Sequence, residues 1–549
     1  MASTALAPAP KSPTGAEAPP PAHHAAVHEK LSKGPGAIGM MIFGVVLIAG
    51  IIYIGYSLSH DLIGVKNTSA MPYILLGVAL FVALAFEFVN GFHDTANAVA
   101  TVIYTHSLDP QIAVTWSGFC NFIGVVLSSG AVAFGIVSLL PVELILQVGN
   151  SAGFAMVFAL LVAAIIWNLG TWWLGLPASS SHTLIGSIIG VGIANQLMQA
   201  RSGTSGVDWA QAANIGKSLV LSPIVGFFVA GLLLLGMKAV IKDPRLYEAP
   251  KGDEPPPWWI RGLLILTCTG VSFFHGSNDG QKGMGLIMLI LIGTVPTTYA
   301  LNHAVTASES QDFIAVSQQT AGVLDKYVQP SASIGDPRED VTEYIRTKEF
   351  KPNTMLALRE LVNGVGTEMA IFKQLSNVPN DRVRNFRNDM YLVGEAIRLM
   401  LKSGAGGISA ADAAVLKNYK ANHIDRATRF IPLWVKVAVA LALGLGTMVG
   451  WKRIVVTVGE KIGKNHLTYA QGAAAEITAM ATIGAADMYG LPVSTTHVLS
   501  SGVAGTMAAN HSGIQMSTVR NLALAWVLTL PAAMMLSGFL FWTFTRLFK

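Results

Sequence analysis

The stretch GLPASSSH, at Gly175–His182, recurs almost unchanged as GLPVSTTH at Gly490–His497. Each copy places a short run of Ser, Thr and His, led by Pro, between long apolar runs. A second pair of motifs accompanies it, GFHD at Gly91–Asp94 and GSND at Gly276–Asp279. The chain is therefore a duplication, and each half carries two unlike polar motifs.

The composition indicates an all-α polytopic membrane protein. Of the 549 residues, 52% are hydrophobic and 12% are charged, whereas soluble domains carry about 25% charged residues. Cys120 and Cys268 both lie in apolar runs, which supports neither a disulfide framework nor a metal cluster. Basic residues at membrane edges explain the net charge of +5, so no nucleic-acid partner is implied.

The chain divides into four parts. We expect a disordered Pro- and Ala-rich tail over 1–35, a first membrane region over 36–301, a mostly helical soluble insertion over 302–430, and the rest of the second repeat over 431–549. The polar motifs begin 84 residues apart in the first half and 214 apart in the second. The difference nearly equals the length of the insertion.

The apolar runs predict where a helix is broken, and the basic loops predict which side of the membrane each loop occupies. The run 71–105 is too long for a simple span of about 20 residues, and its interruption by Phe92–Asp94 after Gly91 predicts a helix broken at mid-depth. The basic loops 238–261 and 452–464 are predicted to be cytoplasmic. The insertion is assigned to the same side.

The Ser/Thr runs suit a tetrahedral oxyanion. If Pro177 and Pro492 occupy first helical turns, the residues after them lie at helix starts, where free N–H groups attract anions. The six hydroxyls belong to Ser179, Ser180, Ser181, Ser494, Thr495 and Thr496. The alternative is that they only cap helices or bond back to carbonyls. His182 and His497 would donate to the anion, carry protons or hold the turn.

Acidic residues at membrane depth mark an ion pathway or a proton relay. Asp94 and Asp279 would repel an anion, so they imply a cation between them: a metal, sodium or their own proton. Neutral or titratable groups accompany them at His93, Asn97 and Asn278. Lys282 has three open roles, which are to face the anion, to pair with Asp279 or to reach the membrane interface.

Two more acids lie in otherwise uncharged runs, Glu87 and Glu476. Either is a candidate for coupling an ion to transport. For Glu87 the alternative is a structural hydrogen bond. Internal repeats with broken helices are typical of a secondary transporter, whose binding site lies where the repeats meet.

Four runs carry a family resemblance: GFHDTANAVATVIYT, GLPASSSHT, GSNDGQKGMG and GLPVSTTH. They resemble the PiT family of inorganic phosphate transporters, in particular its bacterial low-affinity, proton-coupled branch. The resemblance implies inverted-topology halves, about ten to twelve membrane segments, and phosphate bound between the halves. It also implies a multi-pass protein of the bacterial inner membrane. Phosphate-binding roles carry over to Asn97, Asn278 and the six hydroxyls, and coupling roles to Asp94 and Asp279.

Two departures from the family pattern favour protons over sodium. The usual GxND reads GFHD here, and the imidazole of His93 is a poor sodium ligand and a good proton carrier. The sodium-coupled members of the family that this chain resembles have a glutamate where this chain has Asn121. Glu476 is interpreted as the corresponding acid of the second half.

The resulting prediction is a symporter, not an enzyme, that imports inorganic phosphate with protons and has no cofactor. Sodium as the coupling ion, a neutral divalent metal-phosphate as cargo, and arsenate or sulfate as substrate are the alternatives. Further alternatives are an intramembrane hydrolase built on Ser179 or Ser494 and a phosphate sensor whose output is the insertion. The lipid bilayer is a partner, and a homo-oligomer such as a dimer stays open.

Overall fold

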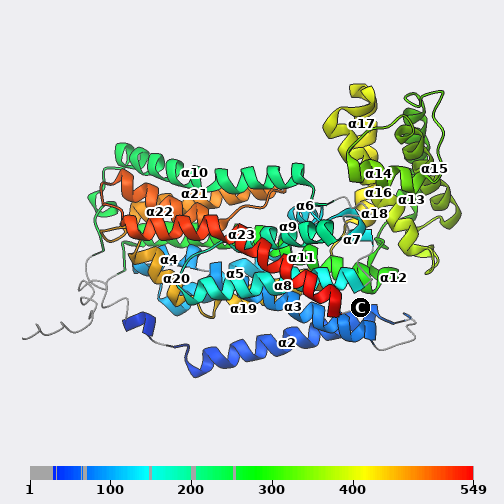
Figure 1. Ribbon diagram of the computed structural model, residues 1–549. Helices are drawn as coiled ribbons and strands as arrows, with labels where there is room; N and C mark the ends of the chain where they lie inside the picture. Colours follow the sequence, from blue (N-terminus) through cyan, green and yellow to red (C-terminus); the bar gives the residue numbers. More distant parts are fainter. Residues whose placement is uncertain are drawn as a thin grey trace, which may run out of the picture.

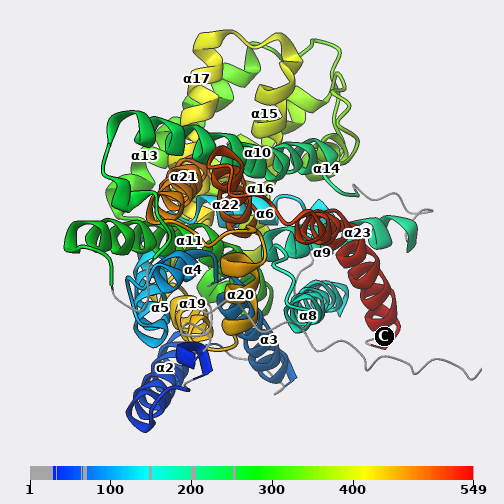
Figure 2. The ribbon, with the colours of Figure 1, turned by 90° about the vertical axis from the view of Figure 1, so that its left-hand side faces the viewer.

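The computed structural model describes residues 29–32, 34–63, 65, 71–94, 96–146, 151–198, 206–250 and 255–547. Its elements are helices, and no strand occurs within these ranges. Figures 1 and 2 show a long bundle with a separate group of helices at one end. The prediction of an all-α fold is confirmed.

Apolar helices long enough to cross a membrane number six in the described part of the chain, or seven if a pair bent by 76° forms one span. The chain is thus a multi-pass membrane protein. The expected ten to twelve segments stay a prediction. The six are α2 (Ala37–Asp61), the run Tyr73–Tyr104 formed by α3 (Met71–Asp94) and α4 (Ala96–Tyr104), α5 (Pro110–Leu127), α8 (Ser151–Trp173), α10 (Trp209–Val240) and α23 (Met516–Leu547).

The remaining membrane-domain helices pack among these six and carry most of the polar motifs. They are α6 (Ala131–Val137), α7 (Val142–Leu146), α9 (Ser180–Met198), α11 (Trp258–Thr294), α12 (Pro296–Tyr299), α19 (Leu433–Thr447), α20 (Lys452–Glu460), α21 (Tyr469–Met488) and α22 (Thr495–Ala509). In the first half, α3 continues as a helix through Gly91–Asp94, so the break expected after Gly91 is not observed there. In the second half α11 runs unbroken through the matching motif, Gly276–Asp279.

The two halves exchange partners in their packing. Helix α9 of the first half packs on α23 of the second, and α22 of the second half packs on α10 of the first. In the same way α5 packs on α11, and α3 packs on α19. This reciprocity is what a duplicated chain with two-fold related halves produces. The inverted topology of the halves stays a prediction.

Glycines allow these helix pairs to touch backbone to backbone. A Cβ atom on Gly276 would lie 2.2 Å from the carbonyl oxygen of Asn121, and one on Gly446 would lie 2.1 Å from that of Phe88. Small residues permit such close approach between membrane helices, where dispersion and polar contacts replace the hydrophobic driving force. The second Asp motif is thereby pressed against α5.

The insertion, residues 302–430, forms its own hydrophobic cluster beside the bundle (Figure 1). Its boundaries at 302 and 430 stay a prediction. Its helices are α13 (Ala307–Asp325), α14 (Pro337–Thr347), α15 (Thr354–Phe372), α16 (Val383–Ser403), α17 (Ala410–Asn418) and α18 (Asp425–Thr428), with short 3₁₀ turns at Leu375–Asn377 and Ala405–Gly407 and a π-helical turn at Tyr419–Ile424.

The insertion and the basic loops lie at opposite ends of the bundle. Arg398 of the insertion pairs with Asp208, which caps the start of α10. At the other end of this 32-residue helix, about 48 Å away at 1.5 Å per residue, Lys238 binds Asn510. Lys464 bonds to Gly513 at that same end. We call these the insertion end and the basic end.

The insertion and the two basic loops cannot share one side of the membrane. The prediction that all three segments are cytoplasmic is therefore wrong for at least one of them. The positive-inside rule counts short loops, whereas long domains cross largely regardless of charge. We accordingly expect the basic end in the cytoplasm and the insertion on the outer side.

This orientation can be checked with single cysteines at exposed positions. Ser331→Cys in the insertion should react with a membrane-impermeant maleimide in intact spheroplasts, whereas Asn465→Cys at the basic end should react after permeabilisation. The native Cys120 and Cys268 are both buried, and the unmodified chain gives the background. The reverse pattern would place the insertion in the cytoplasm.

The close approach at Gly276 predicts a stability difference between two glycines of α11. Gly276→Ala should lower the free energy of unfolding by about 1–3 kcal/mol, because the added methyl group overlaps backbone. Gly262→Ala is the matched control, since no atom lies within 4 Å of its Cβ position. Thermal unfolding in detergent measures both, and equal midpoints would refute the packing argument.

Candidate functional site

The two GLP motifs form matching turns between helices. Gly175 follows α8 and Gly490 follows α21, and both have positive φ values, +67° and +64°, which glycine adopts without strain. The next helices begin at Ser180 and Thr495. The expectation that the motif prolines lie in first helical turns is wrong, because each precedes its helix by three residues.

The first hydroxyl of each motif caps its helix. The backbone N–H of His182 donates to Ser179 Oγ at 3.2 Å, and that of His497 donates to Ser494 Oγ at 3.1 Å. The capping role is therefore observed in both halves. A serine hydroxyl that accepts such a bond still has a hydrogen to donate, so capping leaves both groups able to bind an anion.

The third hydroxyl of each motif reaches into the other half. Ser181 Oγ donates to the carbonyl of Val493 at 2.9 Å and accepts from Lys282 Nζ at 2.5 Å. Thr496 Oγ1 donates to Asp94 Oδ1 at 2.5 Å. Lys282 also pairs with Asp279 Oδ1 at 2.6 Å. Of the three roles open for Lys282, pairing with Asp279 is observed, and with 1% exposure the side chain does not reach the membrane interface.

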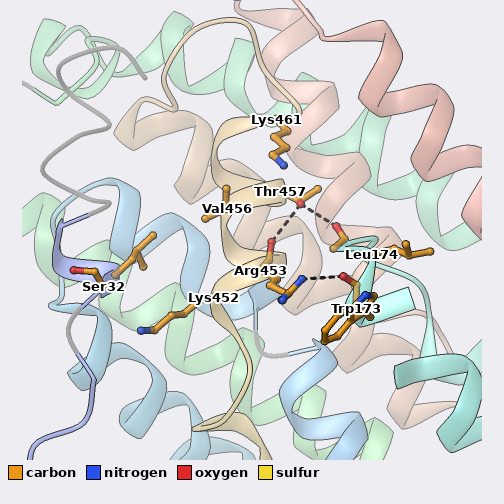
Figure 3. A pocket seen from close by; sticks show the side chains of 10 residues that line it. Ser32, Trp173, Leu174, Lys452, Arg453, Val456, Thr457 and Lys461 are labelled. Carbon is orange, nitrogen blue, oxygen red and sulfur yellow. Dashed lines mark hydrogen bonds between the residues drawn. The ribbon is translucent and has the colours of Figure 1, made fainter. Parts of the chain in front are cut away.

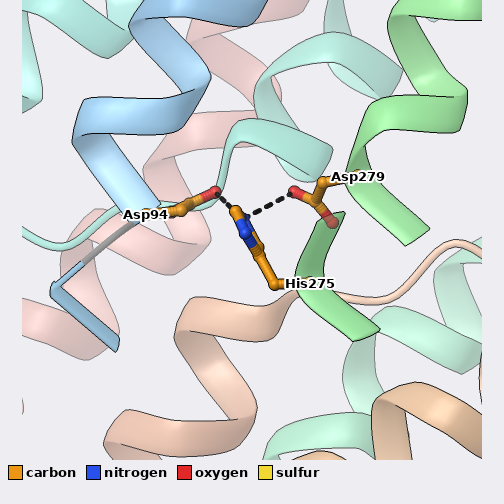
Figure 4. Close-up of side chains that lie close together, drawn as sticks. All are labelled: Asp94, His275 and Asp279. Carbon is orange, nitrogen blue, oxygen red and sulfur yellow. Dashed lines mark ion pairs between the residues drawn. The ribbon is translucent and has the colours of Figure 1, made fainter. Parts of the chain in front are cut away.

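Three buried side chains from both halves form what we call the central group, Asp94, His275 and Asp279 (Figure 4). His275 Nε2 lies 4.0 Å from Asp94 Oδ2 and 3.7 Å from Asp279 Oδ2. His275 is absent from the predicted site. The sequence signal for His275 is its i,i+4 spacing to Asp279, which places both residues on one face of a helix. This relation holds only if the helix continues through the motif.

The hydrogen bonds around Asn121 fix the tautomer of His275. Thr447 Oγ1 donates to Leu443 O, so it accepts from Asn121 Nδ2 at 3.1 Å. Asn121 Oδ1 must then accept from His275 Nδ1, 2.9 Å away. In a neutral imidazole the other nitrogen carries a lone pair. In the neutral form of the ring, His275 Nε2 therefore presents an acceptor to two carboxylate oxygens.

His93 and the asparagines of the Asp motifs have separate places. His93 Nδ1 lies 3.4 Å from Asp94 Oδ1, and its Nε2 lies 3.2 Å from Thr171 Oγ1. Asn278 donates to Leu491 O at 3.1 Å and accepts from Val493 N at 3.4 Å, so its amide holds the second GLP turn. The side chain of Asn97 lies outside the described residues.

The middle hydroxyls differ between the halves. Ser180 Oγ accepts from Asn168 Nδ2 at 3.3 Å. Thr495 Oγ1 is buried and has no hydrogen-bond partner within the described chain. The rings of His182 and His497 lie 4.4 Å apart, and His497 stacks on Trp526 at 4.2 Å. The two histidines thus join the motif helices to each other.

Glu476 lies apart from the central group. Its two oxygens accept from Thr101 of α4 and Thr267 of α11. Thr267 precedes Asp279 by twelve residues, which is about 18 Å along the helix. The correspondence of Glu476 to Asn121 of the first half stays a prediction.

Glu87 lies beside the central group. Its Oε2 accepts a hydrogen bond from Asn90 at 3.4 Å, and a structural bond of this kind is the alternative to a coupling role for Glu87. Its Oε1 has no partner among the described residues. A Cβ on Gly283 would lie 2.2 Å from that Oε1. Because Gly283 has no side chain, Glu87 can approach α11 next to Lys282.

A hollow of about 480 Å³ opens at the basic end beside the first GLP turn (Figure 3). Lys452, Arg453 and Lys461 of the α20 region line it. Arg453 Nη1 donates to Trp173 O at 2.9 Å, and Thr457 Oγ1 donates to Gly175 O at 2.9 Å. Helix α20 is thus tied to the turn that leads into Ser179–Ser181.

Comparison with known proteins gives consistent matches. The model of the phosphate transporter family matches residues 90–537. Two proteins of Escherichia coli K12, named low-affinity inorganic phosphate transporters PitA and PitB, are 44% and 42% identical over 486 residues. These alignments cover 85% of this chain and 96% of each relative. A solved structure titled "The sodium-dependent phosphate transporter" is similar with a TM-score of 0.45 and 19% identity, over 86% of this chain and 98% of that one.

Proposed function

Because this chain belongs to the phosphate transporter family, we propose that it is an inner-membrane symporter that imports inorganic phosphate together with protons. Transport of inorganic phosphate is what the names of its relatives describe. Those names denote transport rather than catalysis, which leaves the hydrolase alternative without support. The coupling ion and the site residues are our own assignment.

The observation that carries proton coupling is the meeting of acceptors at the central group. His275 Nε2, Asp94 Oδ2 and Asp279 Oδ2 converge within 4.8 Å. The imidazole nitrogen and Asp279 Oδ2 lack a hydrogen-bond partner in the described chain. Three acceptors in a buried site repel one another unless a proton or another cation lies among them. An imidazole is suited to exchange that proton.

The charges of the group explain why phosphate and protons would move together. Asp94 and Asp279 carry two negative charges, and Lys282 offsets one. The site is then negative and disfavours an anion. Protonation of Asp94 and His275 makes the site positive by one charge, which matches dihydrogen phosphate. Since isolated charges at membrane depth are costly, anion and protons stabilise each other there.

The two GLP turns supply the phosphate seat in this proposal. Ser179, Ser494 and Thr495 have hydroxyl hydrogens free to point at an anion, and the starts of α9 and α22 favour negative charge. Ser181 and Lys282 would turn from each other to the phosphate. The halves would rock about this seat to expose it to one side at a time.

A divalent cation is the second candidate for the central group, because imidazole and carboxylates are ligands of metals such as zinc. It would be cargo, carried in as a neutral metal-phosphate with the metal on Asp94, His275 and Asp279. Sodium fits less well, since sodium prefers oxygen ligands and an imidazole nitrogen lies at the centre. Arsenate shares the shape and charge of phosphate and should compete. Sulfate remains unprotonated near neutral pH and should compete poorly.

The proton assignment predicts the behaviour of His275→Gln. Glutamine keeps a hydrogen bond to Asn121 but does not titrate. Uptake into proteoliposomes should lose its stimulation by an inward proton gradient, about 5–150-fold for a coupling free energy of 1–3 kcal/mol. Exchange of internal for external phosphate should persist.

His303→Gln, at an exposed histidine of the insertion, is the matched control and should leave the stimulation intact. Uptake that requires sodium and ignores the proton gradient in the unmodified protein would overturn proton coupling. Uptake that requires a divalent cation and carries it in stoichiometrically would favour the metal-phosphate alternative.

The phosphate seat predicts the behaviour of Thr495→Val. Valine matches threonine in shape, and the lost hydroxyl has no partner in the described chain, so folding should be unaffected. The KM for phosphate should rise about 10- to 150-fold, since a hydrogen bond to a charged group contributes about 1.5–3 kcal/mol. Thr543→Val, on the outer surface of α23, is the control. An unchanged KM would remove Thr495 from the seat.

A further inference from the structure

A small cavity lies where the insertion meets the membrane domain. Its volume is about 50 Å³, several times the 10–15 Å³ that holds one water molecule on this measure. Helix α16 of the insertion and helices α6 and α11 of the bundle enclose it. These elements are neighbours in Figure 1. Nothing in the phosphate seat or the central group accounts for this cavity.

Arg387 is a buried cation on the wall of this cavity. Its side chain is 8% exposed, and its Nε has no hydrogen-bond partner in the described chain. Its interactions are a bond from Nη1 to Asn388 Oδ1 at 3.3 Å and a stacking contact with the ring of Tyr391 at 5.2 Å. No carboxylate within the described residues forms an ion pair with it. A buried charge without a counter-ion is strongly destabilising.

The other charged groups of the cavity do not neutralise Arg387. Arg429 lines the same space, pairs with Asp425 at 3.1 Å and lies over the ring of Phe134 at 5.7 Å. Glu395 also lines it, but Arg398 holds both oxygens of that carboxylate.

Burial is the main cause that lowers the pKa of Arg387 to about 10, and the charge of Arg429 adds to the effect. The cavity therefore has an unbalanced positive charge.

The cavity lies on the same face of α11 as Lys282. Gly285, Leu289 and Ile292 line the cavity, and their spacing from Lys282 follows one helix face. Gly285 is about 4.5 Å beyond Lys282 along the axis, and Ile292 is about 15 Å beyond it. Helix α6 closes this interval, because a Cβ on Gly285 would lie 2.8 Å from Ala133 O.

Gln281 fastens α6 in that closed position. Its Oε1 accepts from the backbone N–H of Val132 at 2.9 Å. Its Nε2 donates to Ser277 O at 2.9 Å and to Asp487 Oδ1 at 2.7 Å. The short helix α6, which Gln281 bonds at Val132, thus lies between the cavity and Lys282.

We infer that this cavity is a second oxyanion site, in which Arg387 and Arg429 hold inorganic phosphate at the outer mouth before it passes α6 to Lys282. The guanidinium groups would form charge-assisted hydrogen bonds to phosphate oxygens. The insertion would then serve to capture substrate. The inference rests on phosphate being the substrate and does not depend on which ion is coupled.

The site can be tested by phosphate protection of a cysteine at its rim. Ser138 lines the cavity and is half-buried. In Ser138→Cys, inorganic phosphate should slow modification by a charged methanethiosulfonate about tenfold, as mass spectrometry of that position would show. Adding Arg387→Gln should abolish the protection, and adding Arg429→Gln should weaken it.

Arg384→Gln is the matched control, because Arg384 is an exposed residue of the same helix and its removal alters the net charge equally. Protection should survive it. The KM for uptake should rise several-fold in Arg387→Gln but stay unchanged in Arg384→Gln. Protection should also survive in the His275→Gln background, which separates this site from the coupling proposal. Absence of protection in Ser138→Cys, or protection that persists without both Arg387 and Arg429, would overturn the inference.

Discussion

The structure depends on the close approach of three buried titratable side chains in the middle of the helix bundle. His275 and Asp279 share α11, which is pressed against α5 at Gly276, and Asp94 of α3 lies 4.0 Å from His275. Asn121 fixes the imidazole so that its Nε2 faces the carboxylates. In the proposed mechanism, a cation or proton stabilises this site, and an anion enters only when enough positive charge has gathered. Selectivity and coupling are in this view one electrostatic condition.

The reciprocal packing extends this condition to both halves. Thr496 of the second half bonds to Asp94 of the first, and Ser181 of the first half bonds to Lys282 and Val493 of the second. Neither half has a complete site. A change in the relative position of the halves must therefore alter every one of these contacts, which ties the occupancy of the site to the conformation of the protein.

Much of this arrangement could be predicted from the sequence, because duplicated polar motifs in apolar runs leave few other interpretations. The membrane class, the helical fold and the family all follow from such patterns. His275 could not be found in the same way, because its relation to Asp279 depends on α11 continuing as a helix through GSND. The location of the insertion also depended on a three-dimensional fact, the pairing of Arg398 with Asp208 across the end of α10. Charge patterns in a sequence do not reveal which end of a helix a distant segment contacts.

The bonds of Gln281 have a mechanical consequence. One amide joins α6 of the first half to Asp487, which lies next to the second GLP turn. Lifting α6 from α11 strands the N–H of Val132, and leaving a buried donor unpaired costs about 1–3 kcal/mol. A shift of the second GLP turn would move Asp487 and thereby disturb its hydrogen bond to the same Gln281 side chain. In the proposed transport cycle, the amide of Gln281 would therefore couple the movement of α6 to the movement of the second GLP turn.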